Sequence, residues 1–357
     1  MTANDASVIT AIGMATPVGL TAAQSCAAMR AGISAIGELD FVIQNDSFEE
    51  VAVMGCALRG VTDGYSGLGR WTRLATAALH DLVTNAGLST RELATAALYL
   101  ALPPLGRGGV DARIAQLLGV RIAQWMGVAG IGARTRVFAE GHAAGAHACQ
   151  EALADVERGA VERAVVCGVD SLIEPETLRF FVEKRRLKTE DRPDGLVPGE
   201  AAACFLLERA EQAKAHGARP LASIAAASTA SESVTIWSDE PSAATGLSDA
   251  IRGTLEQLPD QGRNTRLVVC DLNGETYRSK EFGNTAARAL SVIPVKWTVW
   301  HAADCIGDTG AAAFTVSACL GARALARGYA KSDGILVLGS SDDGLRGAAY
   351  LRRVQEA

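Results

Sequence analysis

The chain has 357 residues, enough for two domains of ordinary size or one double domain. Its composition, 48% hydrophobic and 21% charged residues, excludes wholesale disorder. A formal net charge of -6 and an aromatic content of 5% disfavour a nucleic-acid binder, which needs a basic face or base-stacking rings.

Short β-rich runs alternate with alanine-rich stretches, which is typical of an α/β protein with layered sheets. In the first half, the helix at 71–86 is predicted from the apolar spacing of Leu74, Ala78 and Leu82, and it ends at Gly87. The other predicted helices are 21–31 and 143–159, and the predicted strands are 7–14, 51–58, 95–102, 163–168 and 200–208.

The second half repeats this rhythm, with a junction near 213–219. Its predicted helices are 246–258, 284–291 and 310–328, and its predicted strands are 221–227, 267–271, 334–339 and 348–354. Segments 41–47 and 231–245 are expected to be irregular cap loops. We therefore expect an internal pseudo-repeat, with one half at 1–212 and the other at 213–357.

The eight cysteines include no CxxC pair, which argues against zinc-ribbon and thioredoxin-like proteins. Dispersed thiols within apolar runs fit a reducing cytoplasm. The N-terminus lacks the basic region of a signal peptide, and the uncharged stretch 6–29 contains Pro17 and several polar residues. The sequence therefore predicts a cytoplasmic protein without a membrane span.

Several separated stretches resemble one known family, in the family's order. They are an opening strand and turn at 8–19, a helix ending in Asn-Ala-Gly-Leu at 70–88, Gly-Ala-His-Ala at 145–148 followed by Glu-Ala at 151–152, a strand at 158–171, an Asp-Gly-Leu-Val-Pro-Gly-Glu segment at 194–208 and Gly-Ala-Ala at 310–312. These stretches resemble the β-ketoacyl synthases, the ketosynthases of fatty-acid and polyketide synthesis. The resemblance implies a thiolase-like five-layered α-β-α-β-α double domain with pseudo-twofold halves. It also implies a dimer, either with itself or with an active ketosynthase, and an acyl-carrier protein as a further partner.

The family resemblance implies a cysteine nucleophile at the amino end of a buried helix, with two histidines that stabilise negative charge. Alignment on the matching motifs places His142 at the cysteine, Asn273 at the first histidine and Gly307 at the second. Ala302 then stands at a nearby lysine, and Asp343 at a gating phenylalanine. All three catalytic positions are changed, so we expect no condensing activity.

Three functional hypotheses remain open. The first is a non-condensing homologue that acts by protein binding, as a synthase partner, a chain-length-factor-like subunit or an adaptor. The second is an acyltransferase or acyl hydrolase that uses His142 with Glu275 or Asp308, or Cys305 as a relocated nucleophile. The third is a protein that binds an acyl chain or acyl-coenzyme A.

Each candidate also has a structural alternative. His142, predicted to be neutral at a helix amino end, could be a buried residue bonded to nearby backbone. Cys305 could be a small apolar thiol that packs its loop. The spacing of His301, Asp304, Cys305 and Asp308 matches no standard ligand pattern, so no metal is expected, and no cofactor is expected either. The basic run 184–188 could dock an acyl-carrier protein or form a solvated loop.

Overall fold

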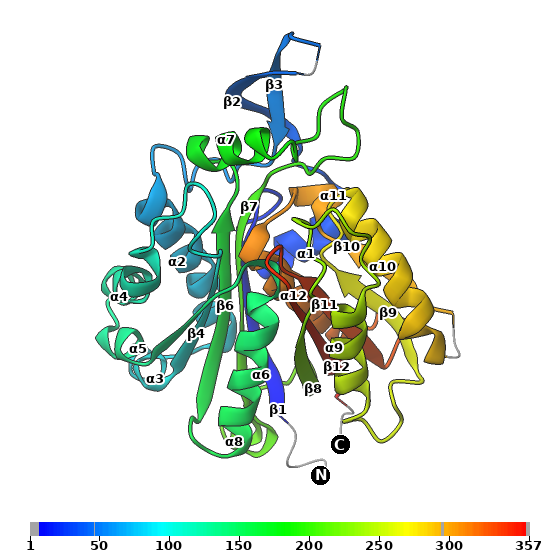
Figure 1. The fold of residues 1–357 in the computed structure, drawn as a ribbon. Helices are drawn as coiled ribbons and strands as arrows, with labels where there is room; N and C mark the ends of the chain where they lie inside the picture. Colours follow the sequence, from blue (N-terminus) through cyan, green and yellow to red (C-terminus); the bar gives the residue numbers. More distant parts are fainter. Residues whose placement is uncertain (1–6, 46, 294–295, 355–357) are drawn as a thin grey trace.

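The computed structural model describes residues 7–45, 47–293 and 296–354. Ten strands form one continuous sheet (Figure 1). Five of them come from the first 212 residues, in the order β5 (Thr135–Ala139), β4 (Ala97–Leu102), β6 (Arg163–Ser171), β7 (Glu200–Arg209) and β1 (Ser7–Ala15). The order continues with β8 (Ala222–Ser231), β12 (Leu345–Arg352), β11 (Gly334–Ser340), β9 (Thr265–Cys270) and β10 (Thr298–His301).

Strand β1 joins the two groups of strands by pairing antiparallel with both β7 and β8. The contact with β8 is short and runs from Ser7–Ile224 to Ile9–Ala222. Towards each edge of the sheet the pairing is parallel, between β6, β4 and β5 on one side and between β11, β9 and β10 on the other. The division at 212/213 stays a prediction, but it coincides with this change from one strand group to the other.

Two helices lie between the strand groups, α6 (Ala144–Glu157) and α12 (Ala313–Ala326). Helix α6 contacts β4 and β6 as well as β8 and β12, and α12 contacts β6 and β7 as well as β9 and β11. The two helices also touch each other, where Gly145 leaves room for the ring of Phe314. Because both faces of the inner strands are covered, β4 and β11 are buried along their whole length.

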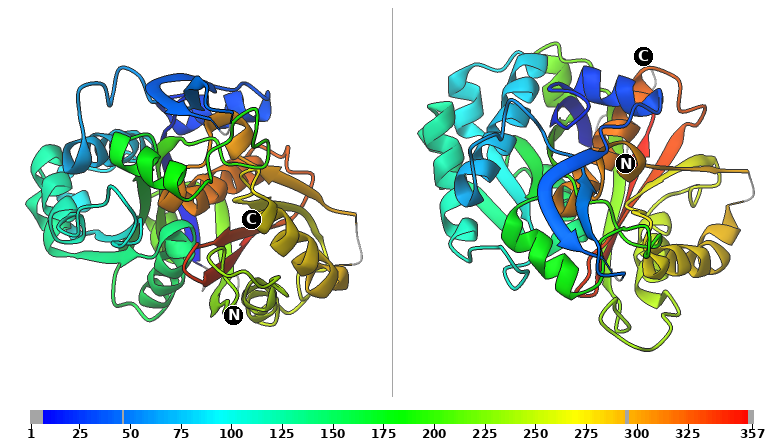
Figure 2. Two further views of the ribbon diagram at one scale, coloured as in Figure 1. Left: turned by 45° about the horizontal axis from the view of Figure 1, so that its top comes forward. Right: turned by 90° about the horizontal axis from the view of Figure 1, so that it is seen from above.

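The outer helices complete the layers (Figures 1 and 2). On one side α2 (Gly67–Ala86) packs on β1, β6 and β7, and α4 (Ile114–Met126) packs on α2. On the other side α9 (Thr245–Leu255) packs on β8 and β12, and α10 (Thr276–Arg288) packs on α9. This arrangement confirms the predicted α/β class.

The remaining elements are short. They are α1 (Ala22–Arg30), α3 (Thr90–Thr95), α5 (Ala129–Ala133), α7 (Pro175–Glu183), α8 (Ala210–Ala215), α11 (Ala303–Ile306) and the 3-10 turns η1 (Gly141–Ala143), η2 (Leu290–Val292) and η3 (Gly310–Ala312). A two-stranded ribbon, β2 (Gly37–Gln44) and β3 (Glu50–Gly55), projects from the body at the top of Figure 1. Leu39, Phe41 and Ile43 on its inner side pack against the apolar cluster around α7.

Two predicted elements need correction. Residues 41–44, expected to be loop, belong to β2, since Phe41 and Ile43 alternate with exposed residues along the ribbon. The helix predicted at 284–291 is α10, which begins at Thr276. Its first two turns bury the charged Arg278 and Glu281, so the apolar spacing that marks a helix is missing there.

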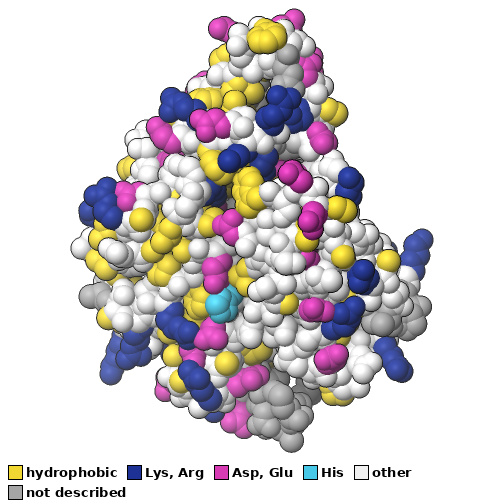
Figure 3. Space-filling model, in the orientation of Figure 1, with side chains coloured by type: hydrophobic (Ala, Val, Ile, Leu, Met, Phe, Trp, Pro, Cys, Tyr) yellow, Lys and Arg dark blue, Asp and Glu magenta, His cyan; other side chains and the backbone are white. Residues whose placement is uncertain are grey.

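In the described part of the chain, no helix combines the length and the apolar character needed to cross a membrane. On the face shown in Figure 3, acidic and basic side chains of the described residues are interspersed.

Candidate functional site

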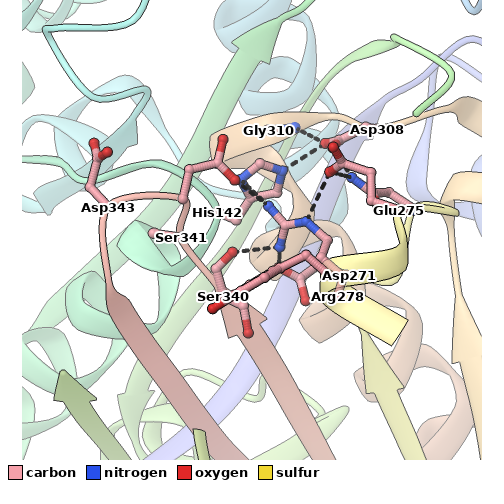
Figure 4. Close-up of polar contacts among 12 residues, drawn as sticks. His142, Asp271, Glu275, Arg278, Asp308, Gly310, Ser340, Ser341 and Asp343 are labelled. Carbon is pink, nitrogen blue, oxygen red and sulfur yellow. Dashed lines mark hydrogen bonds and ion pairs between the residues drawn. The ribbon is translucent and has the colours of Figure 1, made fainter. Parts of the chain in front are cut away.

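His142 lies in the 3-10 turn η1, directly before α6. The preceding Gly141 has a φ of 81°, in the left-handed region that favours glycine. Only 6% of His142 is exposed. Its Nε2 lies 2.8 Å from Oδ1 of Asp308, and its Nδ1 lies 3.2 Å from Nη2 of Arg278 (Figure 4). Both ring nitrogens are therefore engaged.

The hydrogen-bond network assigns the tautomer of His142. A guanidinium only donates, so Nδ1 accepts from Arg278 and Nε2 carries the proton that is donated to Asp308. Burial and the charge of Arg278 lower the pKa of His142, but the carboxylates of Asp308 and Asp342 outweigh them, and the pKa lies above its ordinary value. The acceptor role of Nδ1 requires a neutral ring, as the helix end predicts, while the two carboxylates act in the opposite direction.

Asp308 is the acceptor at the centre of the site. Its Oδ1 also accepts from the backbone N–H of Gly310 (2.8 Å), and its Oδ2 accepts from Nδ2 of Asn273 (2.6 Å). Burial raises the pKa of Asp308, but His142, Arg278 and Asn273 lower it much more, so it falls well below the ordinary value. Asp308 therefore remains a carboxylate inside the protein.

Arg278, on α10, connects this centre to two further carboxylates. It lies 3.0 Å from Asp271 through Nη1 and 2.9 Å from Asp342 through Nη2. Nη1 also donates to the carbonyl oxygen of Ser340. Nε has no hydrogen-bond partner in the described chain, although it lies 3.5 Å from the carboxylate of Glu275.

Arg186 extends the same network. Its Nε and Nη2 donate to the two oxygens of Glu275 at 2.6 and 2.8 Å, and its Nη1 donates to Asp342 at 2.7 Å. The basic run 184–188 is therefore not uniformly solvated. Arg186 and Leu187 are buried, whereas Lys184, Arg185 and Lys188 are exposed, so only these three could face a docked partner.

Of the predicted site residues, the structure brings His142, Asn273, Glu275 and Asp308 together. Asn273 bridges the two carboxylates, since its Nδ2 lies 2.8 Å from Glu275 and 2.6 Å from Asp308. Gly307 precedes Asp308 with a φ of 69°, and a Cβ there would lie 2.8 Å from the carbonyl oxygen of Val197.

Cys305 lies outside this site. It belongs to α11, its Sγ approaches the carbonyl oxygen of Met29 at 3.9 Å, and no interaction joins it to His142 among the described residues. Burial, with a smaller effect of Asp304, raises the pKa of its thiol, which disfavours the nucleophilic thiolate. Cys305 as a relocated nucleophile stays a prediction, and neither the contacts nor the pKa of its thiol favour it. In the described chain, no group of three His, Cys, Asp or Glu side chains is arranged to hold a metal ion.

A pocket of about 250 Å³ reaches His142 from the surface. Its lining residues are Pro104, Gly106, Arg107, Gly141, His142, Asp170, Phe180, Phe181, Lys184, Trp237, Asp342 and Asp343. A second space of about 10 Å³, close to the size of one water molecule, is bordered by Asp271, Asn273, Ala302, Gly307 and Asp308.

Sequence reasoning missed Arg186, Arg278, Asp271 and Asp342. Arg278 is a charged residue on the helix face where an amphipathic helix would have an apolar residue, and this could have drawn attention to it. Arg186 stands in a basic run that would be expected to be solvated, although it is buried. Nothing local in the sequence distinguishes Asp342 from its exposed neighbour Asp343.

Comparisons with known proteins agree with this fold. Residues 106–213 match the family model described as the β-ketoacyl synthase N-terminal domain. A complex of a type II polyketide synthase acyl-carrier protein with its ketosynthase, bound to the hexaketide, superposes with a TM-score of 0.80 at 14% identity, covering 98% of this chain and 99% of that chain. The ishigamide ketosynthase/chain length factor gives a TM-score of 0.79 at 16% identity, with 98% and 99% covered.

A β-ketoacyl synthase from Burkholderia phymatum STM815 has a TM-score of 0.77 and 18% identity, covering 98% of this chain and 100% of that chain. At such identities the structures show a shared fold and nothing finer. Together with the family-model match, they confirm the resemblance to the ketosynthases that the sequence motifs indicated.

Proposed function

We propose that this chain, which has the ketosynthase fold, is a non-condensing homologue that acts by binding a second ketosynthase-fold chain. The observation that carries the proposal is the engagement of both His142 nitrogens, one by Asp308 and one by Arg278. Condensation through a covalent acyl intermediate needs a free nucleophile at the start of α6. The imidazole that stands there is held on both sides by an ionic network.

The charge-stabilising part of the site supports the same proposal. Backbone N–H groups beside a nucleophile are the usual donors to a developing oxyanion. Here the N–H of Ala143, directly after His142, donates to Oγ of Ser341 at 2.9 Å. Asn273, aligned with a family histidine, directs its amide to Glu275 and Asp308. Both donors are occupied by this chain's own side chains.

The partner class follows from the kind of protein that this chain resembles. One similar structure is a ketosynthase/chain length factor, and another is a ketosynthase with its acyl-carrier protein. We propose an active ketosynthase as the partner, with a homodimer as the alternative and an acyl-carrier protein as a further contact. We also propose that the chain is cytoplasmic, because its eight cysteines are buried, free thiols and a reducing compartment keeps thiols in that state.

Intact-mass measurement of the purified chain, after incubation with acyl-coenzyme A and acyl-carrier-protein thioesters, tests the loss of condensing chemistry. We expect no acyl adduct and no ketoacyl product. A stable adduct, or product made by this chain alone, would contradict the proposal.

Co-purification of the tagged chain from its native host, followed by light scattering, tests the partner. We expect a ketosynthase at a one-to-one ratio, and recovery of the isolated monomer would contradict this.

A second candidate, acyl-thioester hydrolysis, is favoured by the 2.8 Å His142–Asp308 pair at the pocket, since a histidine held by a carboxylate is a common general base. It requires that Arg278 releases Nδ1, which would then accept the proton. The test is thioester turnover by the wild type and by His142→Gln. Turnover that disappears in the variant would support hydrolysis, whereas turnover absent from the wild type would exclude it.

A further inference from the structure

The two-stranded ribbon of β2 and β3 has one covered face and one open face. Its inner side is anchored by Leu39, Phe41 and Ile43, which pack against the apolar cluster around α7. Because side chains alternate between the two faces of a strand, the exposed residues of β2 share the opposite, outer face. The ribbon projects at the top of Figure 1, so its outer face is held in place and is open to a partner.

Large apolar side chains stand on this open side of the ribbon. Val42 is 60% exposed and Met54 is 38% exposed, and Ala52 lies opposite Val42 in the register of the two strands. Phe48, in the turn between the strands, is 82% exposed and has a φ of 63°, which is uncommon for a bulky side chain. Three such side chains on one projecting ribbon, with polar residues around them, are typical of an interaction surface.

The charges beside these apolar side chains are all acidic. Residues 31–58 contain five Asp or Glu and no Lys or Arg. Four of the five acids are exposed and form no ion pair with any described residue, namely Glu38, Asp40, Glu49 and Glu50. Elsewhere on the surface an exposed carboxylate does find a partner, as Asp111 does with Arg113. Figure 3 shows acidic side chains on both sides of a hydrophobic one at the top of the molecule.

From this combination we propose that the outer face of the ribbon docks a basic segment of a partner protein, in which Lys or Arg side chains surround an apolar one. The partner's apolar side chain lies against Val42 and Phe48, and its cations face Glu49 and Glu50. Complementary charge orients such a contact, and the apolar side chains supply most of its affinity. The same acidic charges repel nucleic acids and anionic lipid headgroups. The proposal does not depend on whether the chain pairs with a ketosynthase.

Fluorescence anisotropy of the intact protein with three labelled peptides of equal length tests the required chemistry. One peptide consists of lysine and leucine, one of glutamate and leucine, and one of lysine and serine, so each of the last two lacks one feature of the first. We expect the lysine–leucine peptide to bind about tenfold more tightly than either of the others, and to bind more weakly as salt screens the charges. No binding of this peptide, or equal binding of either other peptide, would overturn the proposal.

Two ribbon variants locate the contact. Phe48→Ser removes the exposed ring, and the double change Glu49→Gln with Glu50→Gln removes two charges at the same turn. Each variant should lower the affinity for the lysine–leucine peptide about fivefold or more, and the double variant should also lose part of the salt dependence. All three side chains are exposed, so the urea midpoints of these variants should equal that of the wild type.

Matched controls remove the same kinds of group elsewhere on the surface. Trp125→Ser removes an exposed ring on α4, and Asp239→Asn with Glu240→Gln removes two adjacent exposed charges in the loop after β8. Both controls should bind the lysine–leucine peptide as the wild type does. If the ribbon variants and the controls bind it alike, the peptide does not dock on the ribbon, and the proposal is wrong.

Discussion

Asp308 is buried, yet every hydrogen bond that reaches its carboxylate comes from a donor with a fixed position. His142, Asn273 and the N–H of Gly310 hold the two oxygens, and Arg278 adds a nearby positive charge. A buried ion pair adds little compared with well-packed apolar residues, but removing one member leaves its partners uncompensated. We therefore expect that replacing a single member of this network strongly lowers the stability of the fold.

Asp308→Asn tests this sensitivity, because it keeps the size of the side chain and removes the charge. The new amide group would face the donors of His142 or Asn273. We expect a loss of about 3–5 kcal/mol in the free energy of unfolding, measured by urea denaturation. Asp304→Asn is the control, since Asp304 is exposed and pairs only with His301 in the described structure. Its cost should stay below about 1 kcal/mol.

The same carboxylates predict a pH dependence. Although burial opposes it, the pKa values of Asp308 and Asp342 lie well below the ordinary range because of His142, Arg186 and Arg278. Their contribution to stability is complete above the ordinary carboxylate pKa and is lost as the pH falls through it, below roughly pH 4. Urea midpoints between pH 7 and pH 3 should show this decline. The Asp308→Asn variant should decline less steeply, and equal slopes would contradict the assignment.

Helices and strands with a regular apolar pattern could be predicted from the sequence. Those that bury charged side chains, which pair with other parts of the chain, could not. The helix at 71–86 was found from Leu74, Ala78 and Leu82 and ends at Gly87 as predicted. The start of α10 was missed because Arg278 and Glu281 occupy its buried face. Periodicity records which residues are apolar, and it cannot show that a buried arginine has partners elsewhere in the chain.

Strand β1 and helix α2 approach so closely that only glycine fits at Gly13. A Cβ there would lie 2.8 Å from the Cβ of Leu82 and would collide with the backbone oxygen of Ala78. We expect Gly13→Ala to lower the free energy of unfolding by about 1–3 kcal/mol, as for overpacked cores. The matched change, Gly283→Ala, lies on an open face of α10 and should raise it by about 1 kcal/mol. Urea denaturation of both variants checks the two signs.

In the molecule as a whole, the site combines residues from distant parts of the chain. Motif alignment brought His142, Asn273, Glu275 and Asp308 to one place, because each stands beside a recognisable turn. Arg186 and Asp342 join them through ion pairs that span 89 to 156 residues of sequence. Such pairings depend on the completed fold, so local sequence patterns could not predict them.

The proposed halves, 1–212 and 213–357, share the central helices α6 and α12, each of which touches strands of both groups. If the strands of one half separated from the other, helices α6 and α12 could no longer cover both groups. We therefore expect a single cooperative unfolding transition, with coincident urea curves from tryptophan fluorescence and far-UV circular dichroism. Two separated transitions would show that the halves are independently stable.

The hydrogen bonds that engage both nitrogens of His142 also restrict which substitutions this position can accept. Exchanging the imidazole for a thiol would withdraw the donor to Asp308 and the acceptor from Arg278 in a single substitution. Neighbouring substitutions would then have to accompany it, because the effects of residues that share partners are not additive. Thiol chemistry at position 142 would thus require coordinated changes at several positions.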